Sequence, residues 1–417
     1  MKRNYYIVAL IMLTFFVISF LTNIIGPLIP DIIKGFDLSL TLVAVLPFAF
    51  FIAYGVMSIP SGMLIEKYNE KKIMIAAFIV AFFGSLLLAF FPNYLTAVLS
   101  LFLIGCGMAM LQVVINPLLR TSGGEEHYAF NSVLAQLIFG LASFLSPLVY
   151  SYMVTNLDDK AQKGLFASLH SLVPQNLQWI SLYWLFAIIC LLMVVIILLS
   201  RFPKVELSNE EKAGPVQTYV MLFKKKVVIL YFIAMICYVG TEQGVANWIS
   251  QFLSTYHGYD PQTTGAQSVA YFWGLMTAGG VVGLLLLKIM DSRKVLVSFT
   301  ILALICLSCA LFGSGKVALF AFPLVGFFAS VMYPIIFSLA LNSVSEHHGS
   351  FSGIIVTGII GGAIVPLIIG WLGDTLGLRT GMLFIYITMG YILSIGFWAR
   401  PLITNKTIDL FNKTDRT

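Results

Sequence analysis

The chain has 417 residues, of which 59% are hydrophobic and only 10% are charged, and its mean hydropathy is +0.95. Soluble domains carry about 25% charged residues, so this composition excludes a soluble globular protein and indicates a protein that crosses the membrane several times. The net charge of +6 does not indicate a nucleic-acid partner, because the basic residues form short clusters between apolar runs.

The first 30 residues open with two basic residues and then run apolar for more than twenty positions, which predicts an uncleaved first membrane helix. Later runs are also long enough to cross the ~30 Å hydrocarbon core of a bilayer. The runs are centred near residues 17, 52, 82, 107, 141, 189, 239, 276, 304, 328, 361 and 389. The sequence therefore predicts an all-α membrane protein with twelve transmembrane helices.

The loops predict the orientation of these helices, because lysine and arginine accumulate on the cytoplasmic side. If both termini are cytoplasmic, all but five of the 24 basic residues fall on that side. The five exceptions are Lys34, Lys160, Lys163, Lys316 and Arg379. The longest polar stretch lies between helices 6 and 7. We therefore expect an N-terminal six-helix bundle over residues 1–200, a cytoplasmic linker over 201–219 and a C-terminal six-helix bundle over 220–417.

The two halves resemble each other, as expected of a fold that arose by duplication. The pair Glu126-His127 recurs as Glu346-His347 at an offset of 220 residues, and Pro147 recurs as Pro366 at an offset of 219. The loop GMLIEKYNEKK, after helix 2, has a looser counterpart in GLLLLKIMDSRK, after helix 8. These repeats predict two pseudo-symmetric bundles.

The five cysteines lie inside apolar runs, which predicts neither a disulfide framework nor a metal site. They are Cys106, Cys190, Cys237, Cys306 and Cys309. Cys306 and Cys309 have CxxC spacing, which we interpret as packing of small residues. No cofactor is expected.

Six plus six helices, with a basic loop after the second helix of each half, resemble the major facilitator superfamily. The stretches INPLLR, YVGTEQGVANW and YFWGLM, and the long run from 333 to 374, are similar to its sugar-transporting branch, the fucose-galactose-glucose:proton symporter family. SIPSGMLIEKYNEKK resembles the superfamily's loop 2-3 signature. That resemblance implies that Gly62 lets helices approach, and that Glu66 works with Lys71 and Lys72 as a cytoplasmic latch.

The chain also departs from this family. Proton-coupled fucose transporters of the family carry an aspartate in helix 1 and a glutamate in helix 4, where this chain has Gly26 and Gln112. An arginine common near the end of the helix-8 motif is absent, and Gly280 is nearest to its place. The family's usual carboxylates for proton coupling are therefore missing.

Glu242 is the one ionisable residue that we find well inside an apolar run, close to the middle of the membrane. Such a group costs roughly 2.5 to 3.5 kcal/mol on insertion scales, so it normally faces a wet cavity or a partner. We expect Glu242 to bind a coupling cation, either sodium or a proton, or to bind the substrate directly. The alternative is a hydrogen bond to a neighbouring helix, with Gly240 and Gly244 marking locally unwound backbone.

Uncharged polar and aromatic side chains at similar depth are the expected substrate-binding residues. Amides donate and accept hydrogen bonds and suit a polyhydroxylated neutral solute, while tryptophans stack on the apolar face of a sugar ring. Each single amide has the alternative of an interhelical hydrogen bond. The candidates are Asn23, Gln112, Asn116, Gln136, Gln243, Asn247, Trp248, Gln251 and Trp273.

The sequence thus predicts a secondary active transporter that moves a neutral sugar-like solute across the inner membrane by alternating access. The alternatives are an uncoupled sugar facilitator and a drug or metabolite efflux antiporter. The antiporter is disfavoured because its helix-5 signature is reduced to GLASFLSP, residues 140–147. An enzyme is not expected, since no embedded His, Cys or Ser cluster has supporting partners and no nucleotide loop occurs. The expected partners are the solute and the lipid bilayer, and no nucleic acid is expected. The protein is expected to be a monomer.

Overall fold

The computed structural model describes residues 4–124, 127–157, 171–174, 176–202, 216–344 and 346–402. Glu126, Lys160, Lys163 and most of the expected linker lie outside the described residues, as does the side chain of Glu66.

The described residues form helices and no strands, and twelve segments are long and apolar enough to cross a membrane. Every predicted helix centre lies within one of these segments, which confirms the predicted helix count. The first six are α1–α2 (Tyr5–Thr22, Ile25–Phe36), α3 (Leu40–Tyr68), α4 (Glu70–Phe90), α5 (Tyr94–Gly123), α6 (Tyr128–Asn156) and η2–α8 (Gln178–Ile180, Ser181–Leu199).

A short helix, α9 (Val216–Phe223), precedes the second half. The second six segments are α10–α11 (Lys226–Ala246, Ile249–His257), η3–α12 (Pro261–Gly265, Ala266–Leu287), α13 (Ser292–Phe312), α14–α15 (Gly315–Ala329, Met332–Leu341), α16–η4–α17 (His348–Thr357, Gly358–Ile360, Gly361–Leu376) and α18–α19 (Leu378–Met382, Phe384–Trp398).

Twelve crossings bring both described ends of the chain to one side, which we call the terminal side; the opposite side is the far side. The backbone N–H of Asn4 donates to the carbonyl of Ser122 near the end of α5. At the other end, the N–H of Leu402 donates to the carbonyl of Asn342, just after α15. Both described ends of the chain are therefore bonded to helix ends of the terminal side.

The first and seventh segments occupy equivalent places in the two halves, and both are broken near their middle. The first breaks at residues 23–24, and the seventh breaks at 247–248. Pro27 follows the first break and has no backbone N–H, so it cannot donate a helical hydrogen bond to residue 23. A Cβ on Gly26 would overlap the carbonyl of Ala246 and lie 3.3 Å from the Cα of Asn247. Only glycine permits this approach, so the two breaks meet at the centre of the molecule.

The break in the seventh segment is not at the expected glycines. Gly240 and Gly244 lie inside continuous α10 and face α17, where a Cβ on either would press against Val365. These glycines therefore allow close helix packing, and the part of the alternative interpretation that placed unwound backbone around Glu242 is wrong.

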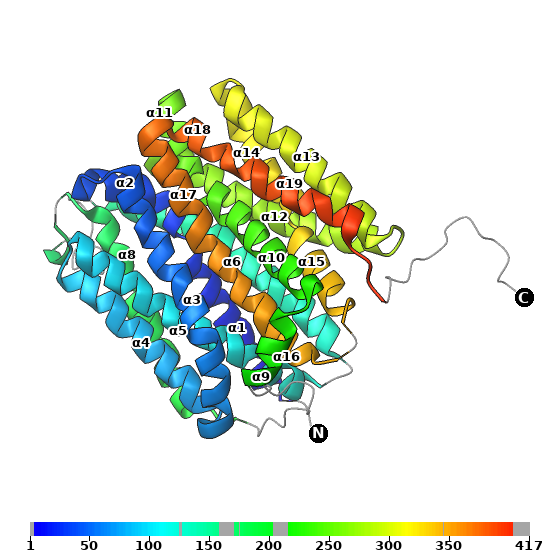
Figure 1. Cartoon of the computed structure of the whole chain (residues 1–417). Helices are drawn as coiled ribbons and strands as arrows, with labels where there is room; N and C mark the ends of the chain where they lie inside the picture. Colours follow the sequence, from blue (N-terminus) through cyan, green and yellow to red (C-terminus); the bar gives the residue numbers. More distant parts are fainter. Residues whose placement is uncertain are drawn as a thin grey trace, which may run out of the picture.

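The two halves pack through α3 against α17 and through α6 against α12. Figure 1 shows α17, in orange, running beside α3, in blue. Gly370 of α17 lies against the carbonyl of Leu40 near the far end of α3, and Gly55 of α3 lies against Ile360. Gly140 of α6 lies against Thr277 of α12.

The contact between the halves ends toward the terminal side. Gly62 is seven residues after Gly55 and therefore on the same face of α3, yet no described atom lies within 4 Å of the place of its Cβ. Gly280, three residues after Thr277 on α12, has equally open space. The structure is closed on the far side and separated on the terminal side.

Candidate functional site

Glu242 lies in α10, near the middle of the seventh segment, and its side chain is half-buried. Its Oε2 accepts a hydrogen bond from the hydroxyl of Tyr238, one helical turn earlier. Its Oε1 accepts from Nε2 of Gln243 at 3.1 Å. No cationic side chain forms an ion pair with Glu242 within the described ranges, so neutral donors alone hold this carboxylate.

The surroundings of Glu242 come from both halves of the molecule. The ring of Tyr238 lies 5.8 Å from that of Tyr333 in α15, between centroids. Gln243 is 3% exposed, and a Cβ on Gly362 of α17 would touch both its side chain and the ring of Phe51 in α3. Glu242 therefore stands beside the place where α10, α17 and α3 meet.

Among the predicted site residues, three buried side-chain nitrogens have no hydrogen-bond partner in the described part of the chain. They are Nδ2 of Asn247, Nε1 of Trp248 and Nε1 of Trp273. Asn247 and Trp248 form the break between α10 and α11, and Trp273 lies in α12. Buried donors are nearly always paired, so these three are positions where a bound solute or water would supply the acceptor.

The amides of the N-terminal half are less enclosed. Gln112 of α5 is half-buried, and its Oε1 accepts from the hydroxyl of Tyr54 at 3.5 Å, a long and weak contact. Asn116, one turn further along α5, is exposed, and so is Gln136 of α6. Both exposed amides lie on the terminal-side halves of their helices, where the two halves of the molecule separate.

Two predicted amides already donate within the protein. Nδ2 of Asn23 donates to Oγ of Ser143 in α6 at 2.8 Å and to Oγ of Ser19 at 3.4 Å, which ties the break of the first segment to α6. Nε2 of Gln251 donates to the hydroxyl of Thr255 at 3.0 Å, one turn along α11.

A second buried carboxylate lies within a membrane segment, so the expectation that Glu242 stands alone is wrong. Asp31 of α2 is only 8% exposed. Sequence reasoning ended the first helix near Pro30, whereas α2 continues to Phe36. The signal for this continuation was the pair of isoleucines at 32 and 33, which extends the apolar run past Asp31.

The family model of the Major Facilitator Superfamily matches residues 11–366. The chain belongs to the major facilitator superfamily. It is 30% identical to a glucose/galactose transporter of Brucella abortus biovar 1 (strain 9-941), over 95% of this chain and 94% of that one. It is 28% identical to the L-fucose-proton symporter of Escherichia coli (strain K12), over 90% of this chain and 89% of that one.

Solved structures of this superfamily share the fold. The E. coli fucose:proton symporter FucP matches with a TM-score of 0.66 and 23% identity, over 94% of this chain and 98% of that one. A bacterial homolog of the human lysosomal transporter Spinster, inward-facing and occupied, matches with a TM-score of 0.79 and 14% identity, over 96% and 97%. The predicted major facilitator fold of two pseudo-symmetric six-helix bundles is confirmed. The chain is a multi-pass membrane transporter and not an enzyme.

Parts of the superfamily's loop 2-3 signature have described positions. Gly62 faces open space. Nζ of Lys71 donates to the carbonyls of Leu198 at 2.9 Å and Ser200 at 2.7 Å, so this cation holds the C-terminal end of α8, where cations are favourable. Lys72 is exposed in the first turn of α4. In this state Lys71 therefore acts within the N-terminal half.

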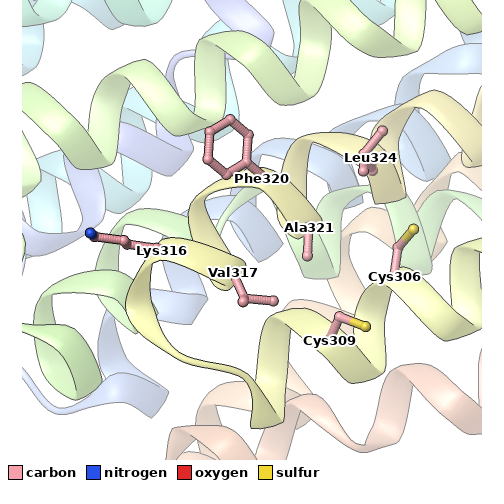
Figure 2. A pocket seen from close by; sticks show the side chains of 7 residues that line it. All are labelled: Cys306, Cys309, Lys316, Val317, Phe320, Ala321 and Leu324. Atoms are coloured by element: carbon pink, nitrogen blue, oxygen red, sulfur yellow. The ribbon is translucent and has the colours of Figure 1, made fainter.

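A surface groove of about 360 Å³ lies between α13 and α14. Figure 2 shows its lining, with Cys306 and Cys309 on one helix and Lys316 and Phe320 on the other. The lining carries no carboxylate or amide, and Phe320 is 76% exposed on the outside of the bundle. The groove therefore faces outward from a membrane-spanning bundle, and Lys316 is the one charged side chain in its lining.

Proposed function

We propose that this transporter carries a neutral sugar across the cytoplasmic membrane by alternating access, coupled to a proton through Glu242. The observation that supports this most is the position of Glu242: a half-buried carboxylate, held by neutral donors alone among the described residues, beside the meeting point of the two halves. A carboxylate without a fixed cationic partner is free to gain and lose a proton, or to bind a cation, as its surroundings change.

A sugar is the solute class that the nearby donors favour. Asn247, Trp248 and Trp273 offer buried N–H groups that have no partner among the described residues, and Gln243 and Gln112 add amides that both donate and accept. Hydroxyl groups of a sugar supply the missing acceptors, and an indole ring stacks on the apolar face of the ring. The relatives named as glucose/galactose transporter and L-fucose-proton symporter support the same class.

A proton is favoured over sodium as the coupling ion. One relative is named a proton symporter, and Glu242 has the neutral hydrogen-bond partners that suit either protonation state. Because Gly26 and Gln112 stand where the family has carboxylates, we assign this role to Glu242, which lies nearer the middle of its segment than Asp31 does. Asn116, Gln136 and Gln251 remain candidates for outer contacts with the solute, whereas Asn23 already donates to Ser143.

The distribution of basic residues supports a cytoplasmic terminal side. On that orientation the structure is open to the cytoplasm and closed to the outside. The halves, residues 1–200 and 220–417, would rock about the close contact between Gly26 and Ala246, with the linker 201–219 on the cytoplasmic side. The latch of Gly62, Glu66, Lys71 and Lys72 would form when the cytoplasmic side closes.

Uptake into proteoliposomes tests this function. The purified protein is given glucose, galactose, fucose and a neutral amino acid, with pH and sodium gradients imposed independently. We expect accumulation of one or more sugars driven by a proton gradient, and none of the amino acid. Equilibration of a sugar without accumulation would indicate an uncoupled facilitator. Accumulation driven by sodium would identify sodium as the coupling ion instead of the proton. Expulsion of lipophilic drugs without sugar uptake would indicate the antiporter and overturn the proposal.

A further inference from the structure

Asp31 joins the two halves of the transporter on the far side. Its Oδ2 accepts a hydrogen bond from the hydroxyl of Tyr150 in α6 at 2.7 Å. Nε2 of Gln262, in η3 at the start of the eighth segment, lies 3.1 Å from both carboxylate oxygens of Asp31. Asp31 and Tyr150 belong to the first half and Gln262 to the second. The carboxylate therefore connects three separate elements across the line between the halves.

Asp31 and Glu242 have the same kinds of partner, a tyrosine hydroxyl and a glutamine amide, but arranged differently. Both partners of Glu242 lie on its own helix, so its hydrogen bonds survive any rigid movement of the halves. The amide that binds Asp31 lies 231 residues away in the other half. Opening of the far side must break the bond between Asp31 and Gln262. The hydrogen bonds of Glu242 are the same whichever side is open.

We propose that Asp31 and Gln262 form the bridge that holds the far side closed and sets how often it opens. An anion bonded to a neutral amide gives a contact stronger than an ordinary hydrogen bond, without the opposite charge that would make a buried pair costly to separate. The transport cycle needs both properties, because the far side has to close firmly and open again. This inference goes beyond the proposed function and holds for any solute.

The surroundings of the bridge position its two side chains. Asp260 accepts the backbone N–H of Gln262 at 3.2 Å and the hydroxyl of Thr263 at 2.6 Å, which fixes the start of η3. The charged groups that act on Asp31 are Lys34, one turn later on α2, and Asp260. Both are exposed, so water screens them, while the Asp31 carboxylate is buried against Tyr150 and Gln262.

Changing the charge at position 262 tests the bridge in opposite directions. Gln262→Lys replaces the amide by a cation and should lock the far side closed through an ion pair with Asp31. Gln262→Glu places two carboxylates together and should push the far side open. The exchanged pair, Asp31→Asn with Gln262→Glu, restores one amide and one carboxylate with their roles reversed, so it should close the far side again.

The readout is the distance between spin labels at Phe91 and Ser314, which are exposed in equivalent far-side loops of the two halves. The five native cysteines of the full-length protein are first replaced. Sugar uptake or, failing that, an unchanged melting temperature shows that this cysteine-free protein is intact, and the labels are then introduced. The parent should show mainly the short distance. Gln262→Glu should move most of the population to the longer distance. Gln262→Lys should leave a narrow distribution at the short distance alone.

Folding is checked by melting temperature and monodispersity for each variant. If Gln262→Glu does not fold, Asp31→Asn alone should still enlarge the long-distance population, because the amide loses its anionic acceptor. Identical distance distributions for the lysine and glutamate variants, or an exchanged pair that stays open, would overturn the bridge. These distances need no substrate, so a failure of sugar uptake and a failure of the bridge are separate results.

Discussion

Asp374, in the last turn of α17, caps the start of α3 through Thr41. Its Oδ2 accepts the backbone N–H of Thr41 at 2.8 Å and the hydroxyl at 2.5 Å, and its Oδ1 accepts the N–H of Leu40 at 2.8 Å. A helix N-terminus has unsatisfied N–H groups and a partial positive charge, and a carboxylate satisfies both. Here the cap comes from the other half of the molecule, so capping α3 also closes the far side.

Asp374→Ala should therefore weaken both the helix and the closed state. The loss of a capping carboxylate costs about 1 kcal/mol, which should lower the melting temperature. The spin labels at Phe91 and Ser314 should show more of the long distance than in the parent. Thr375→Ala, at the exposed neighbouring position, is the control and should change neither measurement. An unchanged distance distribution in Asp374→Ala would show that Asp374 caps α3 without stabilising the closed far side.

The helices were predictable because the signal is local. Hydropathy over about twenty residues gave all twelve segments, and the repeats indicated two halves. The far-side contacts were not predictable, because Asp31 meets Gln262 and Asp374 meets Thr41 across separations of 231 and 333 residues. Such pairs depend on how two bundles dock, which no local pattern records.

The candidate site was predictable as a set but not residue by residue. Asn23 and Asn247 look alike in sequence, since each is an amide inside an apolar run. The structure separates them, because Asn23 donates to Ser143 whereas Nδ2 of Asn247 has no partner in the described residues. Gly26, interpreted as the place of a missing carboxylate, instead lies against the carbonyl of Ala246, where a side chain would not fit.

This difference between the two asparagines gives a paired prediction. Asn247→Ala removes a donor that has no partner among the described residues, so it should weaken sugar binding by about 1 to 3 kcal/mol, roughly 5- to 150-fold, with little change in melting temperature. Asn23→Ala breaks the tie to Ser143 and should mainly lower the melting temperature. Binding is measured by calorimetry or by protection against thermal unfolding.

Gln112→Ala should behave like Asn247→Ala, because the only hydrogen bond described for its side chain is the 3.5 Å contact with Tyr54. Unchanged affinity with reduced stability in Asn247→Ala or Gln112→Ala would assign those amides to interhelical packing instead.

Gly62 should matter only when the terminal side closes. No described atom lies near the place of its Cβ, so Gly62→Leu should fold and melt like the parent in this state. A leucine there should obstruct the approach of the halves on the terminal side and reduce uptake about tenfold or more. Gly390 of α19 also has open space and is exposed, so Gly390→Leu is the matched control with parental uptake. Equal uptake by both variants would remove Gly62 from the cytoplasmic latch.

Asp291 caps α13 on the terminal side, and its contribution to stability should depend on pH. Burial raises the pKa of its carboxyl, but hydrogen bonds from the side chain and backbone N–H of Arg293, and its charge, lower it more, so the pKa lies below its ordinary value of 3.8. A lowered pKa means that the contribution is present above about pH 4 and is lost as the pH falls through the folded-state pKa.

Asp291→Asn keeps a capping side chain but removes the charge that interacts with Arg293 and the helix N-terminus. It should thus lower the free energy of unfolding by about 0.5 to 1 kcal/mol at neutral pH, a modest value because Asp291 is partly exposed. The difference from the parent should shrink as the pH falls below 4, measured by thermal unfolding in detergent. Arg293→Gln removes the ion pair at 3.2 Å and should weaken the same pH dependence. A difference between parent and Asp291→Asn that stays constant over this range would contradict an ionised cap.

Substitutions of Glu242 and Asp31 should impair transport in different ways if Glu242 couples transport to the ion and Asp31 sets how often the far side opens. Glu242→Gln keeps the size of the side chain and removes its charge, so gradient-driven accumulation should fall to simple equilibration while exchange of sugar across the membrane persists. Asp31→Asn should change the rate of exchange, because the far side opens more readily, but should leave accumulation in place.

Both variants are measured in the same proteoliposomes, with the accumulation ratio and the rate of sugar exchange recorded separately. The separation matters because Asp31 and Glu242 are both carboxylates within membrane segments, so the loss of one leaves another ionisable group there. If Asp31→Asn abolishes accumulation and Glu242→Gln does not, the coupling charge lies at Asp31. If Glu242→Gln accumulates sugar like the parent under both proton and sodium gradients, Glu242 serves binding or packing instead, because a side chain that cannot ionise cannot carry the coupling charge.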